Sequence, residues 1–524
     1  MSSHGSHDGA STEKQVTSEK QVASDDIQPA PPAYSAVKTG HGDTAKVAGA
    51  KERTVRNAEL YAAIKDSNIN PRSKESLHIY FAIFIAFCCA CANGYDGSLM
   101  TAILAMPHFQ STFKTGYKGT KVSVVFSLYT VYVNISRVWR YGCECLQTNT
   151  SCVTSSGAMV GSPFAAVISD RYGRKKGMFS GAVVIILGMI VISTSMTVAQ
   201  FVVGRFILGF GIAIMTVAAP AYAMEISPPH WRGRTTGFYN CGWFGGSIPA
   251  TIVTFGTSYI NNNYSWRIPL IFQAFACLIV MGGVYFLPES PRFLMANGRE
   301  EEAKAFLIKY HGNNDPTSRL VILETEEMKE GIRQDGIDKT WWDYRPLFLT
   351  HNGRWRMAQV LMISVFGQFS GNGLGYFNTV IFSQIGVDTV EKQLGYNVLN
   401  SVISAIGALT AVSLTDKMNR RPVLIYGTFA CACALAVNSG LSAALDNQGE
   451  NIIKSYAEGA LAAYFLFNVI FSFTYTPLQG VIPSEALETT IRAKGLALSS
   501  FIVNAVSFIS KLKSPRFPVD EQQG

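Results

Sequence analysis

The chain has 524 residues, of which only 15% are charged, and its mean hydropathy is +0.17. This composition is too apolar for a set of soluble domains. The formal net charge of +8 is spread over short basic clusters between apolar runs, which excludes the continuous basic face of a nucleic-acid-binding protein. We therefore expect no nucleic-acid partner.

The first 76 residues are rich in Ser, Gly, Ala, Lys and Glu and contain no apolar run of the signal-peptide type. Such a segment cannot bury enough apolar surface to fold alone. We expect residues 1–76 to form a disordered tail, and the first apolar segment to serve as the insertion signal.

Eleven apolar segments follow, each near the roughly 20 residues that cross the hydrocarbon core of a bilayer. The predicted spans are 78–99, 122–130 joined to 157–169, 178–198, 201–224, 236–257, 267–287, 357–383, 395–415, 422–443, 458–482 and 495–510. They predict an all-α integral membrane protein with a first bundle at 77–287, a central loop at 288–356 and a second bundle at 357–510.

Short basic loops follow the even-numbered spans. They contain Arg171, Arg174, Lys175 and Lys176; Arg232 and Arg234; Lys417, Arg420 and Arg421; and Arg492 and Lys494. Because Lys and Arg accumulate on the cytoplasmic side, the pattern predicts a cytoplasmic N-terminus and a cytoplasmic central loop. Three lysines in the first predicted outer loop (Lys114, Lys118, Lys121) oppose this orientation, whereas the sequon at 263–265 agrees with it.

Two motifs occur twice, six spans apart. Residues 170–175 (Asp-Arg-Tyr-Gly-Arg-Lys) after span two correspond to 416–421 after span eight, and 220–225 with Arg232 correspond to 477–485 with Arg492. A duplicated six-helix unit is typical of transporters that bind their substrate between the two halves.

These motifs, together with 288–292 (Pro-Glu-Ser-Pro-Arg), resemble the sugar porter family of the major facilitator superfamily over residues 77–510. Residues 93–98, 239–244 and 369–373 are similar to its fungal lactose permease and hexose transporter branch. The resemblance implies the major facilitator fold of two six-helix bundles. It further implies a monomeric importer of a mono- or disaccharide in the plasma membrane, commonly driven by protons. It implies no cofactor or metal, and no enzyme constellation is present.

Two charged residues lie at similar depth in the predicted first bundle. Asp96 is near the outer end of span one, which runs outward, and Arg205 is near the outer start of span four, which runs inward. A charge at the centre of a membrane helix costs roughly 2.5 to 3.5 kcal/mol, so it needs a partner or water. An aspartate that releases Arg205 when protonated would couple proton binding to movement of the bundles. A static salt bridge or an interfacial Asp in water is the alternative.

At the cytoplasmic ends, the resemblance implies an inner gate of ion pairs that holds the outward-open state. Its members in this chain are Asp170, Arg174, Glu225 and Arg232 in the first half and Asp416, Arg420, Glu485 and Arg492 in the second. Simple topology signals are the alternative for the arginines.

A neutral sugar needs amides that donate and accept hydrogen bonds, with aromatic faces against its apolar side. The candidates are Gln368, Asn372, Tyr376 and Asn378 in span seven, Asn240 and Trp243 in span five, and Asn504 in span eleven. Gln368 and Asn372 are four residues apart and would share one helix face. Interhelical hydrogen bonding is the alternative role for each amide.

The sequence departs from the family pattern in two places. A polar block at 131–156 interrupts span two, and its removal would leave one span of about 22 residues. We interpret it as a retained intron or a gene-model error, with an outer-loop insertion as the alternative. The apolar run of span eleven also stops after Ser510, so 511–524 is read as a polar tail and span twelve as missing. Other hypotheses are a non-transporting sugar sensor, an uncoupled facilitator or an inactive product.

Overall fold

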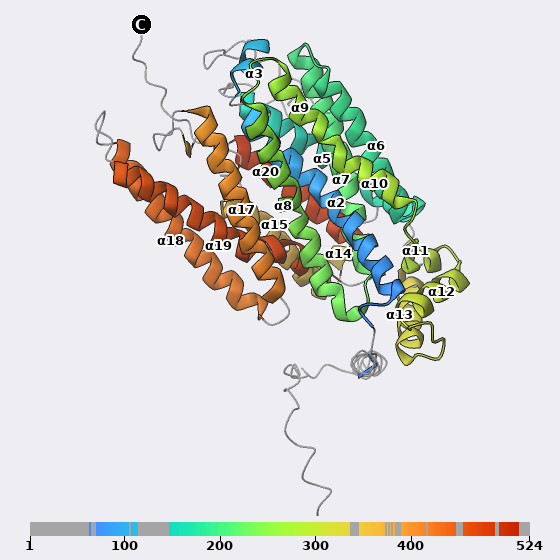
Figure 1. Cartoon of the computed structure of the whole chain (residues 1–524). Helices are drawn as coiled ribbons and strands as arrows, with labels where there is room; N and C mark the ends of the chain where they lie inside the picture. Colours follow the sequence, from blue (N-terminus) through green and yellow to red (C-terminus); the bar gives the residue numbers. More distant parts are fainter. Residues whose placement is uncertain are drawn as a thin grey trace, which may run out of the picture. The chain divides into compact units, whose positions relative to one another are not determined.

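The computed structural model describes residues 62–63, 70–103, 106–113, 146–335, 345–349, 351–371, 375, 378, 381–382, 389–414, 418–446, 454–487 and 492–512. All of them belong to one compact unit that extends from Leu60 to Gly524. The regular elements in this part are helices, which confirms the predicted all-α fold (Figure 1).

The first half is built from long antiparallel helices. They are α2 (Lys74–Ile103), α5 (Leu146–Tyr172), α6 (Arg174–Ser193), α7 (Val198–Ile226), α8 (Arg232–Thr257) and the pair α9 (Tyr264–Phe272) and α10 (Ala274–Val284), with the short α3 (Pro107–Thr112) and the 3-10 turn η1 (Pro229–Trp231). An apolar core runs between most of these helices and includes Leu99, Leu208 and Trp266, each fully buried, while α5 packs on α7 through a separate cluster around Ala165 and Ile214.

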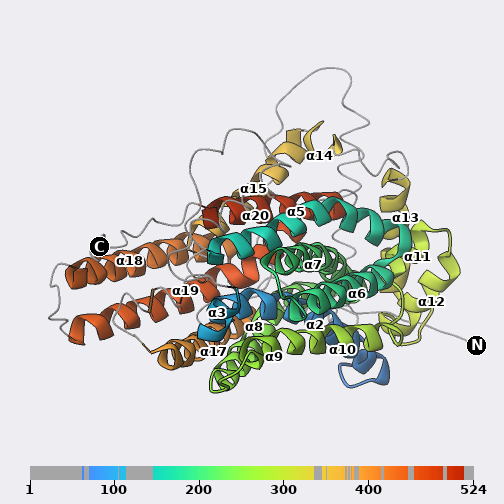
Figure 2. The ribbon, with the colours of Figure 1, turned by 90° about the horizontal axis from the view of Figure 1, so that it is seen from above.

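The polar stretch between the bundles forms short helices, which Figure 2 shows gathered beside the ends of α6 and α10. They are α11 (Pro291–Ala296), α12 (Glu300–Tyr310) and α13 (Arg319–Asp335). Ser290 caps α11 by accepting a hydrogen bond from the Phe293 amide, and Pro291 occupies the first turn, where no amide hydrogen is needed.

The second half comprises α14 (Pro346–Leu349), α15 (His351–Phe369), α17 (Val390–Leu414), α18 (Arg420–Asp446), α19 (Lys454–Ala486) and α20 (Arg492–Leu512). Its core surrounds Tyr464 and Phe467 on α19. The two halves meet where α8 packs on α17 and α19, and where α5 packs on α20. Hydroxyl pairs cross this boundary: Ser247 Oγ lies 3.2 Å from Ser401 Oγ, and Ser162 Oγ lies 3.4 Å from Ser500 Oγ.

Seven of the described helices are long and apolar enough to cross a bilayer, which supports the predicted multi-pass architecture. They are Lys74–Ile103, Arg174–Ser193, Val198–Ile226, Tyr264–Val284, Val390–Leu414, Arg420–Ala444 and Ser455–Pro483, and Lys494–Ile509 is a shorter apolar helix. Because an α-helix rises about 1.5 Å per residue, each of the seven is long enough to cross the hydrocarbon core. α8 covers the predicted fifth span but is less apolar, because many of its residues are Gly, Thr or Asn.

Glycines allow the helices of the first bundle to touch through their backbones. A Cβ atom at Gly94 on α2 would lie 1.9 Å from the carbonyl oxygen of Trp243 on α8, and one at Gly246 on α8 would lie 1.9 Å from that of Cys91. Neither position tolerates a side chain without moving a helix. Small residues supply the close packing that hydrophobic burial cannot drive between helices in lipid.

The second span differs from the expected join of 122–130 to 157–169. Helix α5 begins at Leu146, so the last eleven residues of the predicted insertion belong to this helix, while 122–130 lie outside the described residues. Thr154, inside the predicted insertion, packs so closely on α7 that a Cβ atom at Gly209 would lie 2.2 Å from its carbonyl oxygen. The intron hypothesis remains a prediction.

Span seven also differs from the sequence expectation. Helix α15 ends at Phe369, and Gly371 has a φ of 112°, in the left-handed region where glycine is favoured. Helix α15 thus ends one residue after Gln368, and the helical face that Gln368 and Asn372 were expected to share stays a prediction. Asn372 itself lies outside the described residues.

Candidate functional site

Asp96 and Arg205 form a buried ion pair in the first bundle. Arg205 Nη1 donates to Asp96 Oδ1, and only 1% of the Arg205 side chain and 7% of the Asp96 side chain are exposed. Gln273, between α9 and α10, donates to the same oxygen at 3.3 Å. The predicted proximity of the two charges is therefore present in the structure, with Gln273 as a partner that sequence reasoning missed.

The neighbouring contacts hold this site in place. Tyr95 donates its hydroxyl hydrogen to the carbonyl oxygen of Pro269 at 2.9 Å, which ties α2 to α9 beside Asp96. Arg267, also on α9, donates instead to the carbonyl oxygen of Ser195 at 3.3 Å and lies over the Trp266 ring. Among these neighbours, Arg205 and not Arg267 is therefore the cation that contacts the Asp96 carboxylate.

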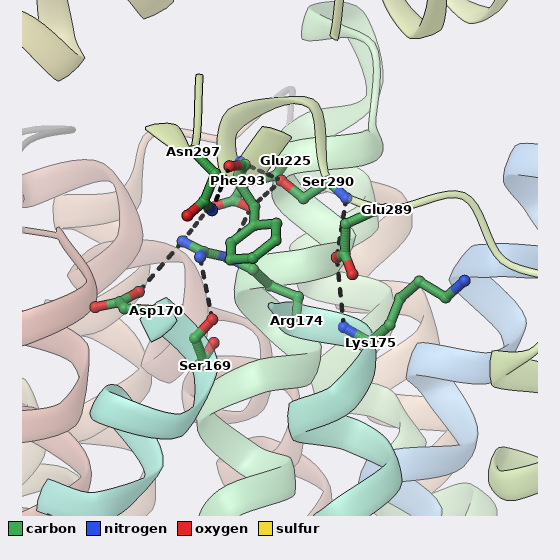
Figure 3. A network of polar contacts seen from close by, with 9 residues as sticks. All are labelled: Ser169, Asp170, Arg174, Lys175, Glu225, Glu289, Ser290, Phe293 and Asn297. Carbon is green, nitrogen blue, oxygen red and sulfur yellow. Dashed lines mark hydrogen bonds and ion pairs between the residues drawn. The ribbon is translucent and has the colours of Figure 1, made fainter. Parts of the chain in front are cut away.

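A second polar network lies at the end of α7 that is farther from Arg205. We call this end of the first bundle the basic end, because Arg174 and Arg232 lie there. Glu225 is 20 residues beyond Arg205 on α7, which corresponds to about 30 Å along a helix. Arg174 on α6 contacts Glu225 through two nitrogens, at 3.0 and 3.1 Å, and Asp170 at 3.4 Å (Figure 3). The structure therefore unites three of the four residues predicted for the first half of the gate.

The 288–292 motif completes this network, although the sequence indicated it only as a family marker. The Ser290 hydroxyl donates to Glu225, and the Phe293 ring lies 5.9 Å from the Arg174 guanidinium (Figure 3). Glu289 accepts hydrogen bonds from the backbone amides of Ser290 at 3.1 Å and Lys175 at 3.5 Å. Burial raises the pKa of the Glu289 carboxyl despite these bonds and the nearby positive charges.

Arg232, the fourth predicted gate residue of this half, has a different partner. Its Nη2 lies 2.9 Å from Glu324 Oε1 on α13, and the other carboxylate oxygen lies 2.6 Å from Nδ1 of His311. Nε2 of His311 faces the carbonyl oxygen of Ile226 at 3.3 Å. The expectation that Arg232 joins Glu225 in one cluster did not anticipate Glu324, because the acid lies 92 residues away in the central loop.

The second half of the predicted gate is only partly described. Asp416 lies outside the described residues, and the side chains of Glu485 and Arg492 are not described, although both positions are helical. Arg420 begins α18 and is partly buried. This half of the gate stays a prediction.

Candidate substrate-binding residues fall on α8, on α15, in the segment that follows α15, and on α20. Gln368 is buried near the end of α15, and Tyr376, like Asn372, lies outside the described residues. Asn378 is buried in a chain of polar contacts: it donates to Asn397 on α17 at 2.9 Å and accepts from the Tyr464 hydroxyl on α19. These contacts agree with the interhelical role that was the alternative for Asn378, and its role in sugar binding stays a prediction.

Asn240 and Trp243 on α8 lie on the face that meets other helices. A Cβ atom at Gly480 on α19 would lie 1.8 Å from Asn240 Nδ2, so Asn240 occupies space that Gly480 leaves open across the boundary between the halves. Trp243 contacts α2, where its ring lies 3.4 Å from the Cβ position of Gly97. Asn504 is partly buried and donates to the carbonyl oxygen of Ser500 in its own helix at 2.8 Å.

The sequence as a whole matches one transporter family. The profile described as "Sugar (and other) transporter" matches residues 81–516. The chain belongs to this family. It is a multi-pass membrane transporter of the major facilitator superfamily and not an enzyme, as the sequence predicted.

Individual relatives agree with this assignment. The MFS-type transporter criB of Aspergillus cristatus is 28% identical over 80% of this chain and 85% of its own length. A high-affinity glucose transporter of Kluyveromyces lactis is 30% identical over 66% of this chain and 65% of its own length. The solved structure of the proton:xylose symporter XylE bound to 6-bromo-6-deoxy-D-glucose covers 83% of this chain and 88% of its own, with a TM-score of 0.68 and 21% identity. This last likeness confirms the major facilitator fold.

Proposed function

We propose that this transporter imports a mono- or disaccharide by alternating access, driven by protons that bind Asp96. The observation that carries the proposal is the buried pair of Asp96 and Arg205. An ionised carboxylate at this depth needs a cationic partner, and its protonation would free Arg205. The names of the similar proteins, a glucose transporter and a proton:xylose symporter, support a sugar as the cargo.

The polar network at the basic end supports alternating access. Ion pairs between Arg174, Glu225 and Asp170 connect α5, α6 and α7. Such pairs hold one state of a carrier when they are formed and permit the other when they separate. We propose that the basic end is cytoplasmic and that the N-terminus lies on the same side, in the plasma membrane, with the monomer as the transporting unit.

The test is uptake by the purified full-length chain in proteoliposomes. Labelled glucose, xylose, lactose and cellobiose would be offered with and without an inward proton gradient. We expect at least one sugar to accumulate only with the gradient, and an uncoupler to abolish its accumulation. Uptake that equilibrates but never accumulates would indicate an uncoupled facilitator, and a lack of uptake of every sugar would contradict the proposal.

A further inference from the structure

Gln273 presents both of its amide functions to a buried site. The residue is 1% exposed, and its Nε2 donates to Asp96 Oδ1. In the part of the chain that the structure describes, its Oε1 is buried and has no hydrogen-bond partner. A buried acceptor without a donor is energetically unfavourable, so native proteins rarely retain one without a reason.

The two donors to Asp96 share one oxygen atom. Arg205 Nη1 and Gln273 Nε2 both reach Oδ1. A proton that binds Oδ1 would face two N–H groups, and neither can accept a hydrogen bond. Arg205 has no acceptor atom in any state, because a guanidinium carries only donors. A glutamine amide, in contrast, presents an acceptor when its terminal torsion turns by half a circle, since this exchanges the places of Nε2 and Oε1.

We propose that Gln273 is a positioning residue for proton coupling, whose amide turns over when Asp96 is protonated. With Asp96 ionised, Nε2 donates to the carboxylate. With Asp96 protonated, Oε1 accepts the hydrogen of the new carboxylic acid. One proton from solution binds Oδ1, Arg205 keeps its own proton and loses this acceptor, and no other group changes charge. The amide therefore satisfies both states of the carboxyl and allows Arg205 to leave.

The surroundings place the charge change on Asp96. From α7 the facing group is Arg205, and from α2 the adjacent Tyr95 uses its hydroxyl on Pro269. From α9, Arg267 donates to the carbonyl oxygen of Ser195. The Gln273 amide does not ionise, so it can hydrogen-bond the Asp96 carboxyl without competing for the proton.

The proposal deepens the proposed function and rests on Asp96 as the proton site. Its test is pH-difference infrared spectroscopy of the full-length protein in lipid. The carboxylic acid band that vanishes in Asp96→Asn belongs to Asp96. We expect this band to shift to higher frequency in Gln273→Met, because the acid hydrogen loses its acceptor, and ¹³C labelling of glutamine side chains should reveal an amide change with the same pH midpoint in the wild type.

The matched control is Gln200→Met at the start of α7. The amide of Gln200 contacts Thr194 and the carbonyl oxygen of Val191, so this variant should leave the Asp96 band unchanged. A band that is identical in the wild type and in Gln273→Met would overturn the proposal, as would an equal shift in both methionine variants.

Transport separates this inference from the function on which it rests. We expect Gln273→Met to retain proton-driven sugar uptake with a turnover lowered by roughly tenfold, because the acid hydrogen has no acceptor when Arg205 leaves the protonated carboxyl. Its KM for sugar should stay near the wild-type value. If the wild type shows the coupled infrared changes but moves no sugar, the proposed function fails and the role of Gln273 stands. If sugar uptake is proton-driven and Gln273→Met matches the wild type in turnover and spectrum, only the role of Gln273 fails.

Discussion

The guanidinium of Arg205 on α7 donates to the carboxylate of Asp96 on α2, and both side chains are almost completely buried. The two residues are 109 positions apart in sequence, so the antiparallel packing of two long helices brings them together. A buried pair of this kind is strongly destabilised when one partner loses its charge. Under the proposed function, protonation of Asp96 would therefore disturb the packing of the whole bundle.

The first prediction concerns Asp96→Asn. The amide keeps the shape and can still accept a hydrogen bond, but it cannot bind a proton. We expect sugar to equilibrate across the membrane while accumulation against a gradient falls to a ratio near one. Proteoliposome uptake with an imposed pH gradient measures this. Asp315→Asn, on an exposed turn of the central loop, is the control and should accumulate sugar normally. Accumulation by Asp96→Asn at the wild-type level would place the proton site elsewhere.

A second prediction concerns the network at the basic end. Glu225→Ala removes the closer of the two carboxylates that pair with Arg174, whose side chain is 10% exposed. We expect a loss of roughly 3 kcal/mol of stability, because the buried Arg174 charge then keeps only its longer contact with Asp170. The control is Glu301→Ala, whose carboxylate is 90% exposed beside Lys304 and should contribute less than about 1 kcal/mol. Thermal unfolding in detergent compares the two, and equal shifts would rule out a special role for Glu225.

The raised pKa of Glu289 predicts a pH dependence of stability. Because burial favours the protonated carboxyl, the folded state binds more protons than the unfolded state between the ordinary and the raised pKa. Stability therefore falls as pH rises through that window and is level above it. Glu289→Gln keeps an oxygen that accepts from Ser290 and Lys175 but carries no charge. We expect its unfolding temperature to exceed that of the wild type increasingly from about pH 4 upward. A constant difference across pH would contradict this.

Gly480 and Asn240 provide a test of the boundary between the halves. A methyl group at Gly480 would collide with the end of the Asn240 side chain, and substitution of Asn240 by alanine would remove this obstacle. We expect Gly480→Ala to reduce uptake at least tenfold. The double variant Gly480→Ala with Asn240→Ala should recover the stability that Gly480→Ala loses. At Gly94 the obstacle is the backbone of Trp243, so Trp243→Ala should not rescue Gly94→Ala. Thermal unfolding and uptake of the two double variants give the comparison, and rescue in both pairs would argue against the distinction.

The last prediction concerns His311, which faces two acceptors. Glu324 lies at Nδ1 and the carbonyl oxygen of Ile226 at Nε2, so each ring nitrogen faces one partner on a different segment. Gln cannot reach both, and we expect His311→Gln to accelerate hydrogen exchange in α13 by about tenfold. His78→Gln, which contacts Tyr310 on α12 and the carbonyl oxygen of Phe286, is the comparison and should leave α13 unaffected. Unchanged exchange in His311→Gln would show that the docking of α13 does not depend on this histidine.

The sequence was sufficient for the fold because hydrophobic length is a strong signal in membrane helices. It also placed Asp96 near Arg205, since helix direction fixes depth. It could not find Gln273, Glu289 or Glu324, because their partners lie on other helices and no periodicity connects them. The end of α15 before Gly371 was missed for a related reason: one glycine in an apolar run is compatible with a continuous helix.

The hydroxyl pairs between the halves, such as Ser247 with Ser401, have a mechanical consequence. Serine hydroxyls exchange a protein partner for water with little change in energy. If the two halves separated, water could replace each serine partner, and the hydrogen bond could form again when the halves returned. Neither serine would leave an unpaired charge or an exposed apolar side chain. The apolar contacts between α8 and α17, in the cluster that includes Phe244 and Ala408, would have to open at the same time, so they and not the hydroxyl pairs set the resistance of this boundary to separation.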